Sequence, residues 1–405
     1  MKKCFKIILS IIVILCILIF LAFFIFINYD KWKASRKIND INNYAIQIEN
    51  ISIDDNVKIV ALGEATHGNK EFQELKLEVF KVLVKNNNYK VFVLEADFGE
   101  CLYINDYIHG NSKLSLDEVL NKFSFNIYHT NQMKDLIEWM KSYNDSLSEN
   151  DKVSFYGFDL QNPEKGVEYI INNLKGVDTE KLNVLVGKIK LSDENVRESI
   201  EYLKTLNSED KLINYAISNI LNSYEYYEKT DFNDYVSLNS NRDALMKENI
   251  TWIYNYENNK GNNKIMISGH NGHISKYEIN YTNMGSLLKN EYNNEYYVVG
   301  TDYFNTNCNI AYGNSRINLK TNSSDILAYQ AKYIENEKFF IDFNSVDKNS
   351  DIYSIINSPI FQANLGENYS FLMKLLPQMT KRKVTPIKLY DGMIFVYNAT
   401  PLEFN

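Results

Sequence analysis

The amino-acid sequence predicts an α/β fold in which a central, mainly parallel β-sheet is flanked by helices, with a helical insertion and an N-terminal transmembrane helix. Three observations lead to this prediction. Short β-branched or aromatic runs alternate with stretches of helical periodicity, one long segment has no strand pattern, and the chain begins with a nearly unbroken apolar run. With 405 residues, 45% of them apolar, the chain is long enough to bury a substantial core.

The apolar run near the N-terminus covers residues 7–27, is interrupted only by Ser10, and follows three lysines. At about 1.5 Å per residue, a helix over this run spans roughly the 30 Å hydrocarbon core of a bilayer. A signal peptide usually has a shorter apolar region that ends in small residues, whereas this run ends in phenylalanine and isoleucine. We therefore expect residues 1–30 to form an uncleaved, single-pass anchor in the cell membrane, with the remaining domain outside the cytoplasm.

The charge and cysteine content exclude other classes of protein. The chain carries 43 Lys and Arg against 51 Asp and Glu, a net charge of −8. An acidic chain has no basic surplus with which to displace the counterions of a phosphate backbone, so we expect no nucleic-acid partner. Four cysteines without a Cys-x-x-Cys pair argue against a disulfide scaffold and against structural zinc. Only Cys101 and Cys308 follow the apolar run, and they can form one disulfide at most.

Seven short β-branched or aromatic runs have the composition of buried strands. They cover residues 57–62, 91–94, 153–155, 264–267, 296–299, 339–341 and 393–397. Between the first two runs, residues 71–85 place apolar side chains at helical spacing. A strand, a helix and a strand at this length form a βαβ unit, which implies parallel pairing and a right-handed crossover.

Residues 164–259 contain no strand pattern, and we interpret them as a helical insertion within one domain that covers residues 31–405. The clearest helix is predicted over residues 243–256, where Asn241 can cap the N-terminus. Its apolar face is formed by Leu245, Met246, Ile250 and Ile253.

Polar side chains follow the predicted strands at the points where the strands end. The carboxyl ends of parallel strands lie on one edge of a sheet, where open α/β folds bind ligands. This edge is predicted to gather Glu64, His67, Glu95, Asp159, His270 and His273. Each residue alone also fits a structural role in a turn or on the surface. Three of only five histidines lie at predicted strand ends, however, and this favours a functional site.

The pairing of Glu64 with His67 points to a particular chemistry. A glutamate three residues before a histidine can orient one imidazole nitrogen and leave the other to take a proton from water. A second carboxylate can position the water, and a second histidine or a cation can polarise a carbonyl. These groups suffice for ester hydrolysis without a covalent intermediate, and the chain has neither a Gly-x-Ser-x-Gly elbow nor a His-Glu-x-x-His motif.

A mononuclear metal site remains open at the same edge, because two histidines and two carboxylates are an acceptable ligand set. Its ligands would be Glu64, His67, Glu95 and His270.

An ordered set of motifs extends over roughly residues 42–402. They are Ala61-Leu62-Gly63-Glu64-Ala65-Thr66-His67-Gly68, Leu94-Glu95-Ala96-Asp97, Gly157-Phe158-Asp159, Arg242-Asp243 before Met246, and Gly269-His270-Asn271 before His273. Together they resemble the erythromycin esterase family. The resemblance implies hydrolysis of a macrolide lactone, with a histidine base that activates water and no obligatory metal.

Carried over by position, the resemblance makes His67 the base, Glu64 and Glu95 its carboxylate partners, and His270 the second essential histidine. The polar residues expected to bind substrate are Lys76, Arg242, Asp159 and His273. Lys76 stands where macrolide-opening members carry arginine. A lysine keeps the charge but loses the planar fork that makes bidentate contacts.

The sequence therefore predicts a membrane-anchored, metal-independent esterase that cleaves a carboxylic ester or macrolactone. If the substrate is a macrolide antibiotic, this activity implies antibiotic resistance. Two alternatives stay open. One is a Glu/His metal-dependent hydrolase of peptide or amide bonds, and the other is a non-catalytic cell-surface protein that binds a ligand such as haem or a glycan.

Overall fold

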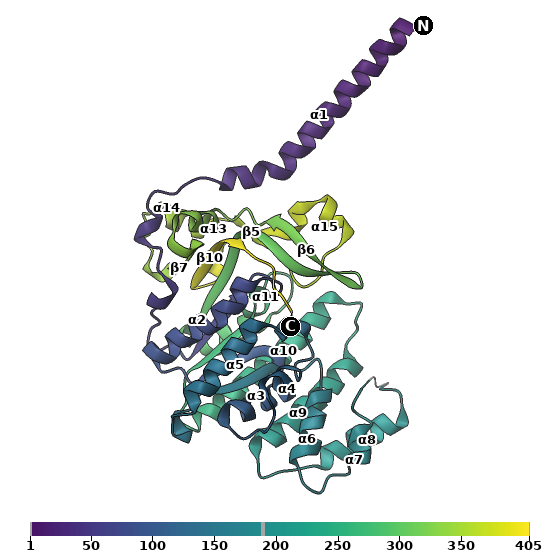
Figure 1. Cartoon of the computed structure of the whole chain (residues 1–405), viewed down its shortest axis with the longest axis vertical. Coiled ribbons are helices and arrows are strands. Elements are labelled where there is room, and N and C mark those ends of the chain that lie inside the picture. Colours follow the sequence, from purple (N-terminus) through teal and green to yellow (C-terminus); the bar gives the residue numbers. More distant parts are fainter. Residues whose placement is uncertain (1, 188–190, 405) are drawn as a thin grey trace.

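A long helix projects from one end of an arrangement of helices around a central β-sheet (Figure 1). The structure is a computed structural model that describes residues 2–187 and 191–404. The projecting helix is α1 (Lys2–Ala34), and the chain enters the domain directly after it through the buried residues Ile38 and Ile41.

The centre of the domain is an eight-stranded sheet with the order β3-β2-β4-β1-β5-β10-β7, and β6 pairs with the far end of β5. The pairs among β1, β2, β3, β4, β5 and β10 are parallel, whereas β6 and β7 pair antiparallel with their neighbours. The strands are β1 (Ile59–Glu64), β2 (Val91–Asp97), β3 (Ser154–Asp159), β4 (Ile265–His270), β5 (Tyr296–Tyr312), β6 (Ser315–Asn322), β7 (Lys338–Asp342) and β10 (Gly392–Ala399). The predicted fold class is confirmed.

All seven predicted strands are present, but three further strands and one detail of the topology were not predicted. β6 is a half-exposed polar strand, and β8 (Ile360–Ala363) and β9 (Lys381–Val384) form a separate antiparallel pair, so none of the three has a buried apolar run. The predicted βαβ unit is parallel, yet its two strands are not neighbours, because β4 lies between β1 and β2 and pairs with both.

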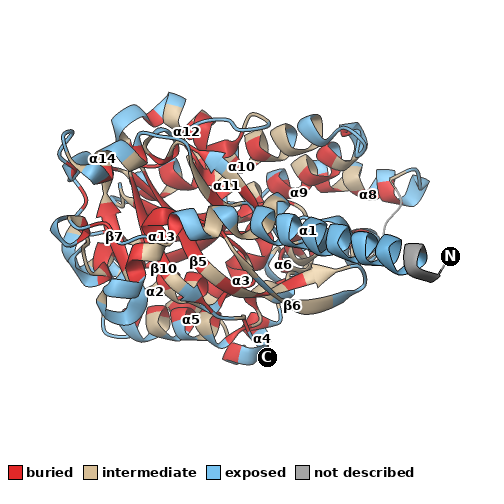
Figure 2. Cartoon of the chain, turned by 90° about the horizontal axis from the view of Figure 1, so that it is seen from above, coloured by how far each residue is buried: buried red, intermediate tan, exposed pale blue. Residues whose placement is uncertain are grey.

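Helices cover both faces of the sheet, and for this reason its parallel strands are buried on both sides (Figure 2). Alternate residues of β1 belong to different cores: Ile59 and Ala61 pack on one side, Val60 and Leu62 on the other. The helices before the insertion are α2 (Lys70–Asn87), α3 (Phe98–His109), α4 (Leu116–Leu120) and α5 (Asn131–Asn144). Those after it are α11 (Asn271–Ile274), α12 (Met284–Tyr292), α13 (Ile326–Gln330), α14 (Asp351–Ile356), α15 (Phe371–Leu375) and α16 (Pro386–Leu389).

Between β3 and β4 the described residues form helices and no strand. These helices are α6 (Glu164–Asn173), α7 (Thr179–Asn183), α8 (Glu194–Thr205), α9 (Lys211–Lys229) and α10 (Tyr235–Asn258). The predicted helix over residues 243–256 is the second half of α10. Its cap is Asp234, which accepts hydrogen bonds from Val236 and Ser237, so Asn241 is not the cap but an exposed residue inside the helix.

Within the described residues, α1 is the one helix that is long and apolar enough to cross a membrane. The helix projects away from the domain (Figure 1), and its residues are exposed along most of its length (Figure 2). A helix of this kind near the N-terminus is either a membrane anchor or a signal sequence. Cys101 and Cys308 lie on α3 and β5 as free buried thiols and do not form a disulfide with each other.

Candidate active site at the carboxyl edge of the sheet

The carboxyl ends of four neighbouring strands bring the predicted polar residues together. Glu64 at the end of β1 lies directly opposite His270 at the end of β4 in the strand register. Glu95 lies two residues before the end of the next strand, β2, and Asp159 ends the strand after it, β3. All three carboxylates are almost completely buried, with exposed fractions of 6% or less. An edge with this many buried ionisable groups requires internal charge compensation.

Glu64 is the partner of His67, as the spacing predicts. Its Oε1 lies 2.5 Å from Nδ1 of His67, and its Oε2 accepts hydrogen bonds from Gln73 at 2.9 Å and from Lys76 at 2.6 Å. The contact through Nδ1 directs the opposite nitrogen of the ring, Nε2, away from Glu64. No described residue forms a hydrogen bond with this Nε2.

Lys76 has a different position from the one expected of a substrate-binding side chain. It lies on α2 beneath Glu64, is 1% exposed, and its Nζ donates to Glu64 and to Oε1 of Gln73 at 2.8 Å. Its charge is therefore used inside the protein to neutralise Glu64. Gln73, which supports this pair from one helical turn earlier, was not predicted.

Arg242 compensates the other two carboxylates. Its Nη2 donates to Oε1 of Glu95 at 3.0 Å and to Oδ2 of Asp159 at 2.7 Å, and its Nε donates to Oδ1 of Asp159 at 3.0 Å. The contact with Asp159 is thus a two-pronged guanidinium–carboxylate pair, which orients as well as neutralises. Arg242 comes from α10, so the helical insertion supplies this cation to the edge of the sheet.

His273 joins the same cluster and lies 3.2 Å from Arg242 and 3.4 Å from Glu95 through its Nε2. Its Nδ1 lies 2.8 Å from Oδ1 of Asp243, a fully buried carboxylate that also accepts the backbone N–H of Met284. Sequence reasoning did not assign a role to Asp243, although it directly follows Arg242 in one of the motifs. The expected binding residues Arg242, Asp159 and His273 are thus brought together with Glu95.

His270 presents an unsatisfied donor. Its backbone N–H donates to Oε2 of Glu95 at 2.7 Å, and its Nδ1 accepts the N–H of Gly272 at 3.2 Å. An accepting Nδ1 requires the proton of a neutral ring to be on Nε2. This Nε2 is buried without a hydrogen-bond partner, and the ring lies 5.2 Å, centroid to centroid, from that of His67.

The two histidines are held in opposite protonation states. Burial works against a charge on His67, but Glu64 outweighs it, with help from Glu95 and Glu367, and raises the pKa of His67 to about 9. Burial, together with the neighbouring His67 and His273, lowers the pKa of His270 to about 3. For Glu64, burial is outweighed by Lys76 and His67, which lower its pKa to about 2. At neutral pH the site therefore holds a charged His67 beside a neutral His270.

Two glycines allow the close approaches on which this arrangement depends. A Cβ atom on Gly269 would lie 2.8 Å from Oε2 of Glu95, so glycine leaves room for Glu95 to reach the backbone of His270. A Cβ on Gly68 would lie 1.9 Å from the carbonyl oxygen of Asn309, where β5 packs on the turn that carries His67.

The two carboxylates considered as metal ligands are committed to other contacts. Glu64 and Glu95 each have a cation within hydrogen-bond distance, the buried Lys76 and the half-buried Arg242 respectively. A dication would have to compete with these charges for the same oxygens. Among the residues that the structure describes, no three His, Cys, Asp or Glu side chains are arranged as a metal-binding group.

The carboxyl edge of the parallel sheet thus carries a carboxylate–histidine pair and a second histidine that can donate a proton, and groups of these types can transfer protons and stabilise negative charge. The chain belongs to the erythromycin esterase family, whose profile matches residues 84–399. Membership of this family indicates a hydrolase.

Individual relatives have low sequence identity to this chain, but the matched regions cover about two thirds or more of both chains. Erythromycin esterase type II of Escherichia coli is 23% identical over 329 residues, which cover 67% of this chain and 72% of that protein. A crystal structure of a Bacillus cereus protein superposes with a TM-score of 0.71 at 19% identity, covering 93% of this chain and 99% of that one. A mutant of the erythromycin esterase EreC in its open conformation gives a TM-score of 0.54 at 15% identity, covering 88% and 97%. At these identities the solved structures support the fold.

The buried pair of Lys76 and Glu64 predicts a strong, non-additive effect on stability. Lys76→Met leaves a buried carboxylate unpaired and should lower the free energy of unfolding by about 3–5 kcal/mol. The double variant Lys76→Met/Glu64→Gln should be less destabilised than the sum of the single variants, by up to about 3 kcal/mol. Urea unfolding in detergent measures both, with Lys85→Met, an exposed lysine on the same helix, as control. Equal stability of the two single lysine variants would contradict the ion pair.

The opposite pKa shifts predict the titration of the histidines. In ¹⁵N-histidine spectra, His67 should stay protonated until the pH approaches about 9, and His270 should stay neutral down to about 3. The stability that His67 contributes is full below its ordinary pKa of 6.5 and is lost as the pH rises through about 9. The contribution of Glu64 is full above 4.5 and is lost as the pH falls toward about 2. Glu64→Gln should move the His67 transition down, whereas the exposed Glu248→Gln should not. An unmoved transition in Glu64→Gln would remove Glu64 as its cause.

Proposed function

We propose that this protein hydrolyses a carboxylic ester or lactone by means of water activated by His67, without a metal. The observation that carries the proposal is the pairing of His67 with Glu64 through Nδ1 beside the unpartnered Nε2–H of His270. When His67 is deprotonated, its Nε2 is available to take a proton, and His270 has a proton available to donate. The two rings lie side by side at the ligand-binding edge of the sheet.

The proposed reaction begins with deprotonated His67. Its Nε2 takes a proton from water as the water oxygen attacks the carbonyl carbon, and Glu64 stabilises the imidazolium that forms. The Nε2–H of His270 donates to the carbonyl oxygen, where negative charge develops. The carbon–oxygen bond to the alcohol then breaks, and His67 returns its proton to the departing oxygen. The products are a carboxylic acid and an alcohol, and for a lactone both remain on one opened ring.

Glu95 and its partners are assigned to positioning. Glu95 accepts the backbone N–H of His270 and is itself held by Arg242, so it determines where the donor ring lies. Burial would raise the pKa of Glu95, but His273 and Arg242 outweigh it and hold that pKa well below the ordinary value. Glu95 therefore stays charged over the range in which His67 acts.

We propose macrolides and simpler esters as the first substrates to test, because a relative is named erythromycin esterase type II. Antibiotic resistance would follow if a macrolide ring is opened. The metal-dependent amide hydrolase is the weaker candidate, since Lys76 and Arg242 already neutralise the carboxylates that a metal would need.

Catalysis by His67 predicts a large loss of rate on substitution. His67→Asn should lower kcat/KM by about 10²–10⁴-fold, the usual contribution of positioned acid–base catalysis. His109→Asn, the same change at a histidine outside this edge, should leave the rate unchanged. The wild-type rate should rise with pH until about 9, because only deprotonated His67 can take the proton. Hydrolysis of erythromycin and of an aryl ester measures these effects. A fully active His67→Asn would exclude His67 as the base, and loss of wild-type activity in chelator would support the metal alternative.

We also propose that α1 is an uncleaved anchor in the cell membrane, with the domain outside the cytoplasm. The full-length chain should stay in the membrane fraction after washes with high salt, because the α1 side chains that would contact lipid are apolar. Mass spectrometry of the N-terminus shows whether this segment has been cleaved off. Release by salt alone, or an N-terminus that begins after residue 27, would contradict the anchor. Protease protection in intact cells tests the orientation.

A further inference from the structure

The segment of residues 371–379 exposes a compact set of large apolar side chains. It consists of α15 and the 3-10 turn η9 (Pro377–Thr380). The exposed side chains are Phe371 at 62%, Leu372 at 52%, Leu375 at 51%, Leu376 at 38% and Met379 at 39%. We call these five residues the α15 patch. Contiguous exposed apolar groups of this kind mark contact sites for a partner or a membrane.

The α15 patch is held in this orientation by packing on its inner side. Met373 packs against a small separate core formed by Cys308, Ile310, Leu365 and Tyr369. Ser370 caps α15 by accepting the N–H of Met373 at 3.3 Å. The helix thus packs on the domain through the half-buried Met373, and its other side chains are exposed.

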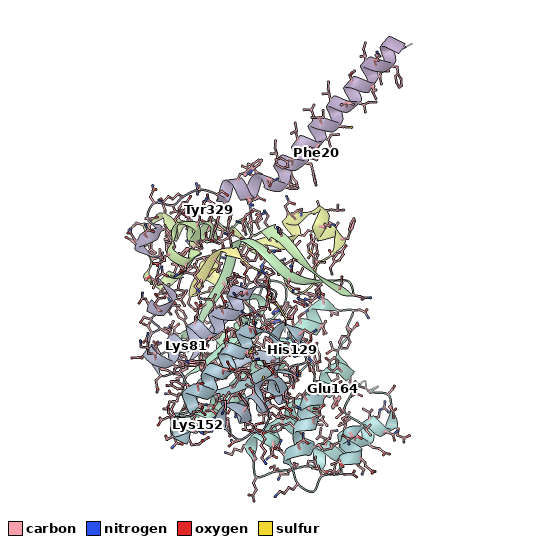
Figure 3. All side chains as sticks on the ribbon, viewed as in Figure 1. Phe20, Lys81, His129, Lys152, Glu164 and Tyr329 are labelled. Atoms are coloured by element: carbon pink, nitrogen blue, oxygen red, sulfur yellow. The ribbon has the colours of Figure 1, made fainter. Side chains whose placement is uncertain are left out.

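What lies beside the patch is the base of α1. Gln378 in η9 donates from Nε2 to the carbonyl oxygen of Phe26 at 3.2 Å. Lys381, which directly follows η9 and is 7% exposed, has its Nζ 3.6 Å from Oδ2 of Asp30. In Figure 1, α15 lies at the end of the domain from which α1 projects. Figure 3 labels Phe20 on the projecting helix and Lys152 at the opposite end of the molecule.

The charges in these segments are mainly basic, although the whole chain is acidic. Residues 371–383 contain Lys374, Lys381, Arg382 and Lys383 and no acidic residue, and residues 31–37 also contain only basic charges. Lys381 is buried and pairs with Asp30, which leaves the other basic residues to face outward. Basic residues next to an apolar surface are attracted to anionic lipid headgroups. Apolar side chains rimmed by lysine and arginine are the pattern of an interfacial membrane element.

We propose that the α15 patch is a second membrane contact, which inserts into the interface of an anionic bilayer beside α1. The proposal rests on the anchor proposed for α1 and is independent of the esterase chemistry. With two points of contact, the domain is held against the membrane in one orientation instead of turning freely on its helix.

The test measures how close the patch lies to lipid in the full-length protein. Cys4 and Cys16 are replaced by alanine, which leaves the buried Cys101 and Cys308 unreactive in the folded protein. An environment-sensitive NBD dye is then attached at Leu375→Cys, and the protein is reconstituted in phosphatidylcholine vesicles with and without phosphatidylglycerol. Lipids that carry a nitroxide near the headgroup serve as quencher. Matched proteins carry the dye at Leu18→Cys in α1 and at Glu149→Cys, beside Lys152 at the far end.

We expect the dye at Leu375 to lose about half of its emission to the nitroxide lipid, since interfacial segments lie about 5–10 Å into the headgroup boundary. Quenching should be stronger with phosphatidylglycerol, and the dye at Glu149 should not be quenched. Quenching at Leu18 but not at Leu375 would overturn the second contact and leave the anchor intact. No quenching at either position would overturn both. A blue-shifted but unquenched dye at Leu375 would show that protein, such as a second copy, covers the patch instead. Equal quenching in both vesicles would overturn the recognition of anionic headgroups.

Discussion

The site depends on the neutralisation of buried carboxylates by two cations, the buried Lys76 and the half-buried Arg242. Glu64 ends β1 and Glu95 lies near the end of β2, strands that are buried on both faces, where a lone negative charge is costly by several kcal/mol. Lys76 comes from the helix that follows β1, and Arg242 comes from the helical insertion. Because Lys76 and Glu64 are both buried, neither can be removed without leaving the other without its charged partner. The glutamates can therefore remain charged inside the protein and act on the histidines.

This compensation also separates the roles of the two histidines. His67 shares an oxygen of Glu64 and is stabilised as a cation, whereas His270 receives a backbone N–H at one nitrogen and is held neutral. Neighbouring groups whose pKa values are driven apart are typical of acid–base sites. The contact that raises the basicity of His67 also reduces the fraction that is deprotonated at neutral pH. The arrangement thus favours a strong base at the expense of its availability.

The sequence predicts the parts of this protein that depend on local pattern. Apolar runs located the buried strands, and polar residues at their ends located Glu64, His67, Glu95 and His270 at one edge. Pairing order is not local: no periodicity indicates that β4 lies between β1 and β2. The position of Lys76 was also out of reach, because a lysine on an amphipathic helix is normally exposed and only the buried Glu64 reverses this preference. β6, β8 and β9 have no buried apolar run, so their formation depends on pairing with neighbouring strands and not on a local pattern.

The origin of Arg242 has a consequence for motion. This residue is about two turns inside α10, a helix of 24 residues that belongs to the insertion and not to the sheet. Displacement of α10 would withdraw the shared cation from Glu95 and Asp159 and leave two carboxylates together in a medium of low dielectric constant. Such a pair takes up a proton from solution. A shift of the insertion and the uptake of a proton by the sheet edge are therefore one thermodynamically linked event. A molecule whose binding displaced α10 would therefore alter the ionisation of the site without touching a strand.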